Sequence, residues 1–205
     1  HLKPLAEDAL SLPVRTGKAR VIGIEPASLV TKSLVREVKT DDAGCFQSAL
    51  NPGLTKIAVI ERHKRTGKLG IGILEGYGLT GGAIATTISH DSHNIVVAGD
   101  NDPDMLLAVR ELADMGGGIV SVHGGSIRRL PLPIAGLMTS ADPQEVNAVL
   151  HDMLVAARAE LGIPEDVEPF MTLSFMALPV IPELKLTARG LFNVNTFSFV
   201  GVEAD

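Results

Sequence analysis

Aromatic residues and cysteine are scarce in this sequence of 205 residues, which has no Trp, one Tyr and an aromatic content of 3%. A core without large rings must be built mainly from aliphatic side chains and Met, which allows close backbone packing. The single cysteine, Cys45, excludes an intrachain disulfide and a zinc site made of cysteines. The reducing cytoplasm therefore fits this chain best.

Basic clusters and long apolar runs are also missing. The formal net charge is -6, and Lys and Arg occur singly or in pairs, so binding to nucleic acid phosphates is not expected. The longest helix-like apolar stretch, residues 104–115, is interrupted by charges and does not approach the ~20 apolar residues of a membrane span. Residues 1–9 lack the basic and then apolar order of a secretion signal. We expect a cytoplasmic protein without nucleic acid or membrane partners.

The sequence contains enough apolar material for a folded domain, since 45% of its residues are hydrophobic and only 20% are charged. We interpret residues 1–17 as an N-terminal connecting segment and residues 18–205 as the domain. Within the domain, residues 18–55 contain possible lead-in strands, at 18–24 and 31–38, followed by an irregular connection. Residues 56–205 form the predicted main body.

The main body alternates strands with two helices. Strand-like runs fall at residues 56–62, 69–74, 81–89, 94–98, 119–123, 126–130, 184–187 and 196–200. One helix is predicted at 102–115, with Asp102 as its N-cap, Pro103 in its first turn and three glycines at its end. A second is predicted at 142–161, where Asp142 and Pro143 cap the start and an apolar stripe should face the sheet. These patterns predict an α+β fold, with one or more mixed β-sheet layers and two main helices.

Two apolar segments rich in proline, residues 130–138 and 170–182, are predicted to be extended walls that serve the core or an interface. The glycines between residues 70 and 82 do not have the spacing of a phosphate-binding loop. His123 and His151 fit a turn and a partly exposed helix position, so we assign them no role.

The densest polar cluster is the hexapeptide SHDSHN, residues 89–94, which lies between two apolar strands. His90 and His93 could act as acid and base groups or as ligands, Asp91 could orient an imidazole, and Asn94 could fix an amide or purine edge. The alternative is a turn whose polar side chains, Ser92 among them, cap their own backbone. Spacing alone leaves both interpretations open.

A second polar group comes at the end of the predicted strand 56–62 and consists of Glu61, Arg62 and His63. A carboxylate, a guanidinium and an imidazole would emerge together there, followed by a basic turn at residues 64–68. Charges at strand ends are common without a function, so a solvated loop is the competing interpretation.

The sequence resembles the C-terminal domain of adenine deaminases, which belong to the amidohydrolase superfamily. The resemblance spans residues 20–203 and rests on motifs in the family's order, namely KIAVIERHKRTGKLGIGILEGYGL, GGAIATTISHDSHNIVVAGDNDPDM, LPLPIAGLMTS, PFMTLSFMALPVIPELKLTARGL and NTFSFVGVE. The residues that match the family's distinctive positions are Glu61, Arg62, His63, His90, Asp91, Ser92, His93 and Asn94.

The resemblance implies an enzyme of purine salvage that hydrolyses adenine to hypoxanthine and ammonia. The divalent metal, manganese or iron, would be held by an amidohydrolase barrel N-terminal to this domain, because the barrel's H-x-H pair and later His and Asp ligands are absent here. No metal ligand is therefore assigned in this chain. The expected partners are that barrel, adenine in the complete enzyme, and further copies in a homo-oligomer.

Three functions remain to be separated. The chain could be an enzyme domain that is inactive alone and forms part of an active-site lid or assembly interface. It could instead be a non-catalytic oligomerisation or binding module that uses the apolar segments 130–138 and 170–182. A small metallohydrolase using His63, His90, His93 and Asp91 would be a third possibility, although their spacing does not support a metal site.

Overall fold

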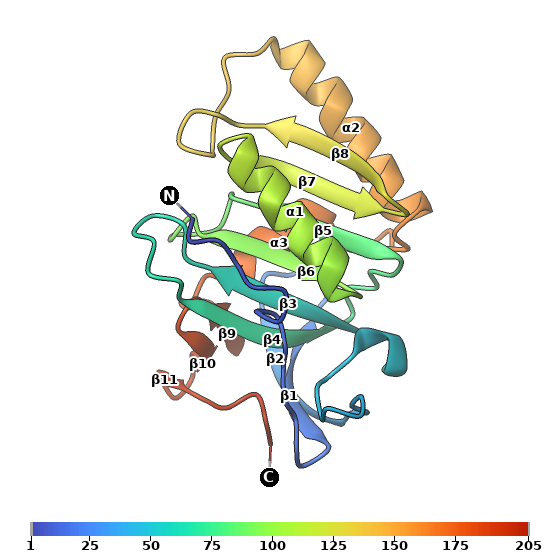
Figure 1. Cartoon of the computed structure of the whole chain (residues 1–205), viewed down its shortest axis with the longest axis vertical. Coiled ribbons are helices and arrows are strands. Elements are labelled where there is room, and N and C mark those ends of the chain that lie inside the picture. Colours follow the sequence, from blue (N-terminus) through green and yellow to red (C-terminus); the bar gives the residue numbers. More distant parts are fainter. Residues whose placement is uncertain (1, 205) are drawn as a thin grey trace.

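The computed structural model describes residues 2–204, which form a large twisted sheet flanked by helices (Figure 1). The strands are β1 (Lys18–Ile24), β2 (Thr31–Glu37), β3 (Leu54–Ile60), β4 (Leu69–Glu75), β5 (Gly82–Thr86), β6 (Ile95–Gly99), β7 (Gly118–His123), β8 (Ser126–Pro131), β9 (Leu184–Thr187), β10 (Gly190–Asn193) and β11 (Ser198–Phe199). The helices are α1 (Asp102–Asp114), α2 (Pro143–Ala159) and α3 (Pro169–Phe175), with a 3-10 turn η1 (Ser48–Leu50). None of these helices is long and apolar enough to cross a membrane.

The main sheet has eight strands in the order β2-β1-β4-β3-β6-β5-β7-β8. The β1 and β4 strands run parallel, whereas the other neighbours are antiparallel, so the predicted α+β class with a mixed sheet is confirmed. The predicted pairing of strands 18–24 and 31–38 is also found. The strands β1 and β2 belong to the same sheet as strands of residues 56–205, the segment that we predicted to be the main body.

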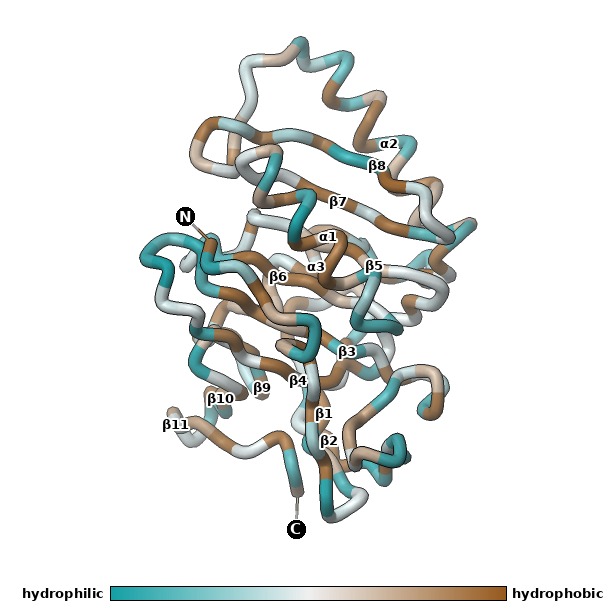
Figure 2. The backbone as a smooth tube through the Cα atoms, in the orientation of Figure 1, coloured by the Kyte–Doolittle hydropathy of each residue, from teal (hydrophilic) through white to brown (hydrophobic). Residues whose placement is uncertain are grey.

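Hydrophobic clusters cover both faces of the sheet, because side chains alternate along each strand. On one face, β3, β5, β6 and β7 pack against α1, which lies in front of the sheet in Figure 1. On the other face, α2, α3 and a small sheet of order β11-β10-β9 cover the strands. Figure 2 shows the corresponding concentration of hydrophobic residues along the central strands.

The segment that precedes β1 is part of the packed structure. Leu2 and Leu5 pack against the core beneath α1, and Leu10 is fully buried. The buried ammonium of Lys56 on β3 donates to the Leu10 carbonyl at 3.0 Å and to Asp102 Oδ1 at 2.6 Å. The predicted connecting segment, of which residue 1 lies outside the described residues, is thereby held to β3 and α1.

Two local predictions are wrong, and one strand was not predicted. Residues 169–175 are helical, because Glu168 caps the backbone N–H of Met171 and Pro169 occupies the first helical turn. The first predicted helix is capped by Asn101, whose side chain accepts from Asp104 N at 2.9 Å, and not by Asp102. At the C-terminal end, the two predicted short strands are found as β9 and β11, and β10 lies between them in the sequence.

The apolar stripe of α2 faces the sheet over only part of its length. Its buried residues, Met153, Ala156 and Ala157, lie in the C-terminal half, while Val146 and Leu150 are half-buried and Val149 is 38% exposed. The N-terminal half therefore leaves part of its apolar face uncovered. The predicted cap of this helix is confirmed, since Asp142 accepts from Gln144 N at 2.8 Å.

Candidate functional site

Two polar loops meet at one end of the sheet. The loop that contains Glu61, Arg62 and His63 follows β3, and residues 87–94 connect β5 to β6. The end of β3 pairs with the start of β6, Ile60 opposite Ile95, so the two loops begin side by side. Arg62 Nε donates to the His93 carbonyl at 2.6 Å, and His63 Nε2 lies 2.8 Å from the Ser92 carbonyl. The structure thus joins the two clusters that the sequence marked separately.

A third loop, residues 132–138, is fastened to the other two. Arg62 Nη2 donates to the Ala135 carbonyl at 2.7 Å, and the buried Thr87 Oγ1 donates to the Gly136 carbonyl at 2.5 Å. The backbone N–H of Gly118 in turn donates to Thr87 Oγ1 at 2.8 Å. Thr87 and Gly136 were not singled out from the sequence. Neither a Thr beside a β-strand nor a Gly in an apolar loop indicates such a contact.

Arg62 is therefore the connecting group of the cluster. Its guanidinium bonds to carbonyls of two loops while it belongs to a third, and burial lowers its pKa from the usual value. An arginine remains protonated after such a shift. Its fixed charge suits it to hold the loops in one arrangement and does not suit it to proton transfer.

Glu61 serves the conformation of its own loop. Its carboxylate accepts from the backbone N–H groups of His63, Lys64 and Thr66 and from the Thr66 hydroxyl, at 2.6 to 3.0 Å. Burial opposes ionisation, but these hydrogen bonds prevail and lower the pKa of Glu61 to about 2. The carboxylate is thus ionised near neutral pH and fully engaged, which leaves it poorly placed as a general base.

His90 lies between the site and α3. Its backbone N–H donates to the Ser174 carbonyl at 3.2 Å, and its ring packs on Phe175 with 4.4 Å between ring centroids. The ring centroids of His90 and His93 are 6.4 Å apart. Asp91 and Ser92 are exposed at the tip of the loop.

Three polar atoms of the SHDSHN loop are buried without a hydrogen-bond partner among residues 2–204. They are Ser89 Oγ, His93 Nδ1 and Asn94 Oδ1. A buried polar atom that lacks a partner costs about 1–3 kcal/mol, so such atoms in a native protein call for an explanation. The pKa of His93 is lowered, because burial disfavours the imidazolium and because His90 and Arg62 lie nearby. His93 is consequently biased toward the neutral form.

The family model for the adenine deaminase C-terminal domain matches residues 28–198, a stretch that includes all three loops. The chain belongs to this family. Relatives include adenine deaminases from Nitratidesulfovibrio vulgaris Hildenborough, 59% identical over 203 residues, and Clostridium acetobutylicum, 44% identical over 201 residues. Adenine deaminase 2 from Carboxydothermus hydrogenoformans is 48% identical over 203 residues. Each comparison covers 98% of this chain but 35% of the relative.

The chain therefore spans about a third of the length of these adenine deaminases and corresponds to their C-terminal part. Within residues 2–204 of this adenine deaminase C-terminal domain, no group of three or more His, Cys, Asp or Glu is arranged to hold a metal ion. His63, His90, His93 and Asp91, although neighbours, do not make such a group.

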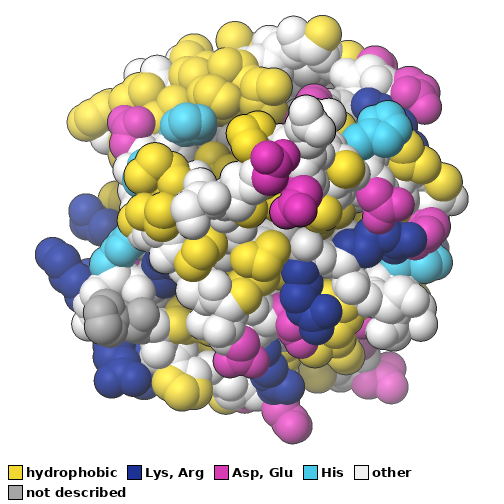
Figure 3. Space-filling model, turned by 90° about the horizontal axis from the view of Figure 1, so that it is seen from above, with side chains coloured by type: hydrophobic (Ala, Val, Ile, Leu, Met, Phe, Trp, Pro, Cys, Tyr) yellow, Lys and Arg dark blue, Asp and Glu magenta, His cyan; other side chains and the backbone are white. Residues whose placement is uncertain are grey.

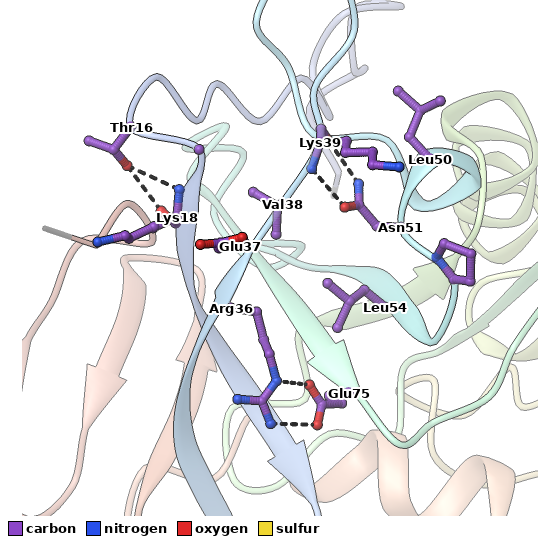
Figure 4. A pocket seen from close by; sticks show the side chains of 12 residues that line it. Thr16, Lys18, Arg36, Glu37, Val38, Lys39, Leu50, Asn51, Leu54 and Glu75 are labelled. Atoms are coloured by element: carbon purple, nitrogen blue, oxygen red, sulfur yellow. Dashed lines mark hydrogen bonds and ion pairs between the residues drawn. The ribbon is translucent and has the colours of Figure 1, made fainter.

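Of two pockets compared in the domain, the smaller one lies next to the three loops. The larger, of about 720 Å³, lies between β1, β2 and the 39–54 segment (Figure 4). Its Arg36 is neutralised by Glu75 through two hydrogen bonds of 2.6 and 2.8 Å, and no residue of the three loops lines it. A smaller hollow of about 300 Å³ is lined by Leu2, Arg62, Arg65 and Thr87, among others, and adjoins the loop cluster.

Proposed function

We propose that this domain works as the C-terminal part of an enzyme that hydrolyses adenine to hypoxanthine and ammonia in the cytoplasm, for purine salvage. The relatives that support the proposal are named adenine deaminases. The metal that activates water, manganese or iron, would belong to the preceding amidohydrolase barrel of the complete enzyme. The ligands of that metal are accordingly proposed in the barrel and not in this domain.

Within that enzyme, the SHDSHN loop would face the mouth of the barrel and help to close over adenine. The observation that carries this proposal is the junction of residues 61–63 with residues 89–94, where three buried polar atoms have no hydrogen-bond partner in the described part of the chain. Because these atoms are buried, a rearrangement of the loop that brought them to partners on another molecule would recover this free energy. Closure would also exclude water from the reacting base.

The chemistry of the loop suits a neutral base better than an anion. The lowered pKa of His93 favours an uncharged imidazole, which can donate or accept a single hydrogen bond at neutral pH. After such a rearrangement, Asn94 could present its amide oxygen to the exocyclic amine of adenine, a pairing that proteins use for this base. Asp91, exposed at the loop tip, would disfavour negatively charged nucleotides.

The test is adenine turnover by a fusion of the N-terminal two thirds of the Nitratidesulfovibrio vulgaris relative with residues 2–205 of this chain. In this fusion, His90→Ala and His93→Ala should each lower kcat/KM more than tenfold, while the thermal midpoint stays within a few degrees. His151→Ala, which changes an exposed histidine on α2, is the matched control and should leave turnover unchanged.

Unchanged kinetics in both loop variants would refute the proposed contact with adenine. The isolated chain should be inactive when it is assayed with added manganese or iron. Adenine turnover by the isolated chain would place the reaction in this domain. It would overturn the proposal that hydrolysis takes place in the N-terminal barrel.

A further inference from the structure

Exposed and half-buried apolar side chains stand on the uncovered half of α2 and on the loop that follows β8. On α2 they are Val146, Val149 and Leu150, and the loop exposes Ile134 by 47% and Met138 by 58%. We call these five residues the α2 strip. Figure 3 looks down on this end of the molecule and shows hydrophobic side chains gathered in a broad patch. Apolar side chains gathered in this way mark an interaction site more often than scattered single residues do.

The burial pattern along α2 also indicates an interaction site. An amphipathic stripe buries its residues along the whole helix when the covering layer is complete. Here the stripe is buried at Met153 and Ala157 but remains partly open at Val146 and Leu150, two turns closer to the N-terminus. The helix therefore has an apolar face suited to a layer that residues 2–204 do not supply.

The α2 strip is coupled to the candidate site. Its loop is held by the hydrogen bond from Arg62 to the Ala135 carbonyl, and the same arginine holds the His93 carbonyl. Leu2 lines the small hollow next to Arg62, so a preceding segment would arrive at this end of the molecule. In the relatives, the region outside the comparison makes up about two thirds of the protein.

We propose that the α2 strip is the docking surface for the N-terminal part of the complete adenine deaminase. This inference rests on the proposed function, and it names the surface through which the two parts hold together. Ile134 and Met138 of the strip lie on the loop that Arg62 connects to the SHDSHN loop, so docking at the strip would fix the position of the SHDSHN loop relative to the barrel. An apolar contact suits two parts of one chain, since such permanent interfaces resemble a core.

The test uses the same fusion, with a protease site inserted before Leu2. After cleavage, the two parts should co-elute in size-exclusion chromatography. The double variant Met138→Asp, Val149→Asp should weaken their association at least tenfold, because it introduces charge into an apolar contact. The two side chains are 58% and 38% exposed, so the domain should fold normally, and the single variant Ile134→Asp provides an independent check in the loop.

Val155→Asp is the matched control. Val155 is 51% exposed on the same helix but lies on the side opposite the stripe, five residues from Leu150 and nine from Val146. This variant should leave the association unchanged. Equal association of the wild type and both strip variants would overturn the proposal, as would separation of the wild-type parts on cleavage.

A dimer of the isolated chain that the strip variants dissolve would identify a second copy as the occupant and would also overturn the proposal. Adenine turnover of the uncleaved fusion separates this inference from the proposed function. An inactive fusion whose parts stay bound through the strip would refute only the function. An active fusion whose strip variants still associate would refute only the docking surface.

Discussion

Replacing Arg62 by Ala should loosen the three-loop cluster and lower the stability of the domain. The change removes two hydrogen bonds from a charged donor, to the His93 and Ala135 carbonyls at 2.6 and 2.7 Å. Bonds of this kind contribute roughly 1.5–3 kcal/mol each, and the partial exposure of the guanidinium reduces that value. We expect a total loss of about 2–3 kcal/mol in the free energy of unfolding.

The assay is urea unfolding followed by far-ultraviolet circular dichroism, because the sequence has no Trp to report on tertiary structure. The expected loss would lower the thermal midpoint by roughly 4–12 °C in a domain of this size. Arg62→Lys retains the charge but cannot bond to both carbonyls in the same way, so it should recover no more than about half of the loss.

The result that would refute this reasoning is an Ala variant within about 0.5 kcal/mol of the wild type, the range of an ordinary surface substitution. A Lys variant as stable as the wild type would also contradict the argument. It would mean that charge alone, and not the arrangement of two donors between the loops, provides the stabilisation.

Two further variants test the surroundings of this cluster and a separate buried charge. Gly136 has φ of +74°, and an added Cβ would lie 2.9 Å from Arg62 Nη2, so Gly136→Ala should cost about 1–3 kcal/mol. The matched control is Gly124→Ala, with φ of +53° and open space, which should cost less in urea unfolding; equal losses would exclude the contact with Arg62. Lys185 is fully buried and donates to the Leu29 carbonyl, and burial lowers its pKa to about 8. Between pH 8 and the unfolded value of about 10.4, the unfolded chain binds more protons, so the contribution of Lys185 to stability rises with pH. Lys185→Met should therefore raise stability by about 2 kcal/mol at pH 7, and this advantage should shrink in urea titrations toward pH 10; a constant difference would contradict the shift.

Local sequence patterns predicted most strands and both long helices, because each signal resides within a few residues. Asp142 with Pro143 marked the start of α2, and the glycines at 116–118 marked the end of α1. The short helix α3 was missed because the prolines around it favoured an extended segment, whereas Glu168 and Pro169 start a helical turn. Its seven residues are too few for periodicity to identify.

The candidate site was predictable as two polar clusters but not as one site. Their union depends on β3 lying next to β6, a pairing of strands separated by β4 and β5 in the sequence. The roles of Thr87 and Gly136 depend on a contact across 49 positions of the chain. Neither composition nor spacing encodes such a distant contact, although the polar residues that flank it were recognisable.

The two strands that carry the SHDSHN loop are buried at every residue, in β5 from Gly82 to Thr86 and in β6 from Ile95 to Gly99. Substitutions in these strands would disturb packing on both faces of the sheet. Asp91 and Ser92, in contrast, stand exposed at the loop tip. A substitution at Asp91 or Ser92 would therefore change what the loop contacts without disturbing the buried strands that hold the loop in place.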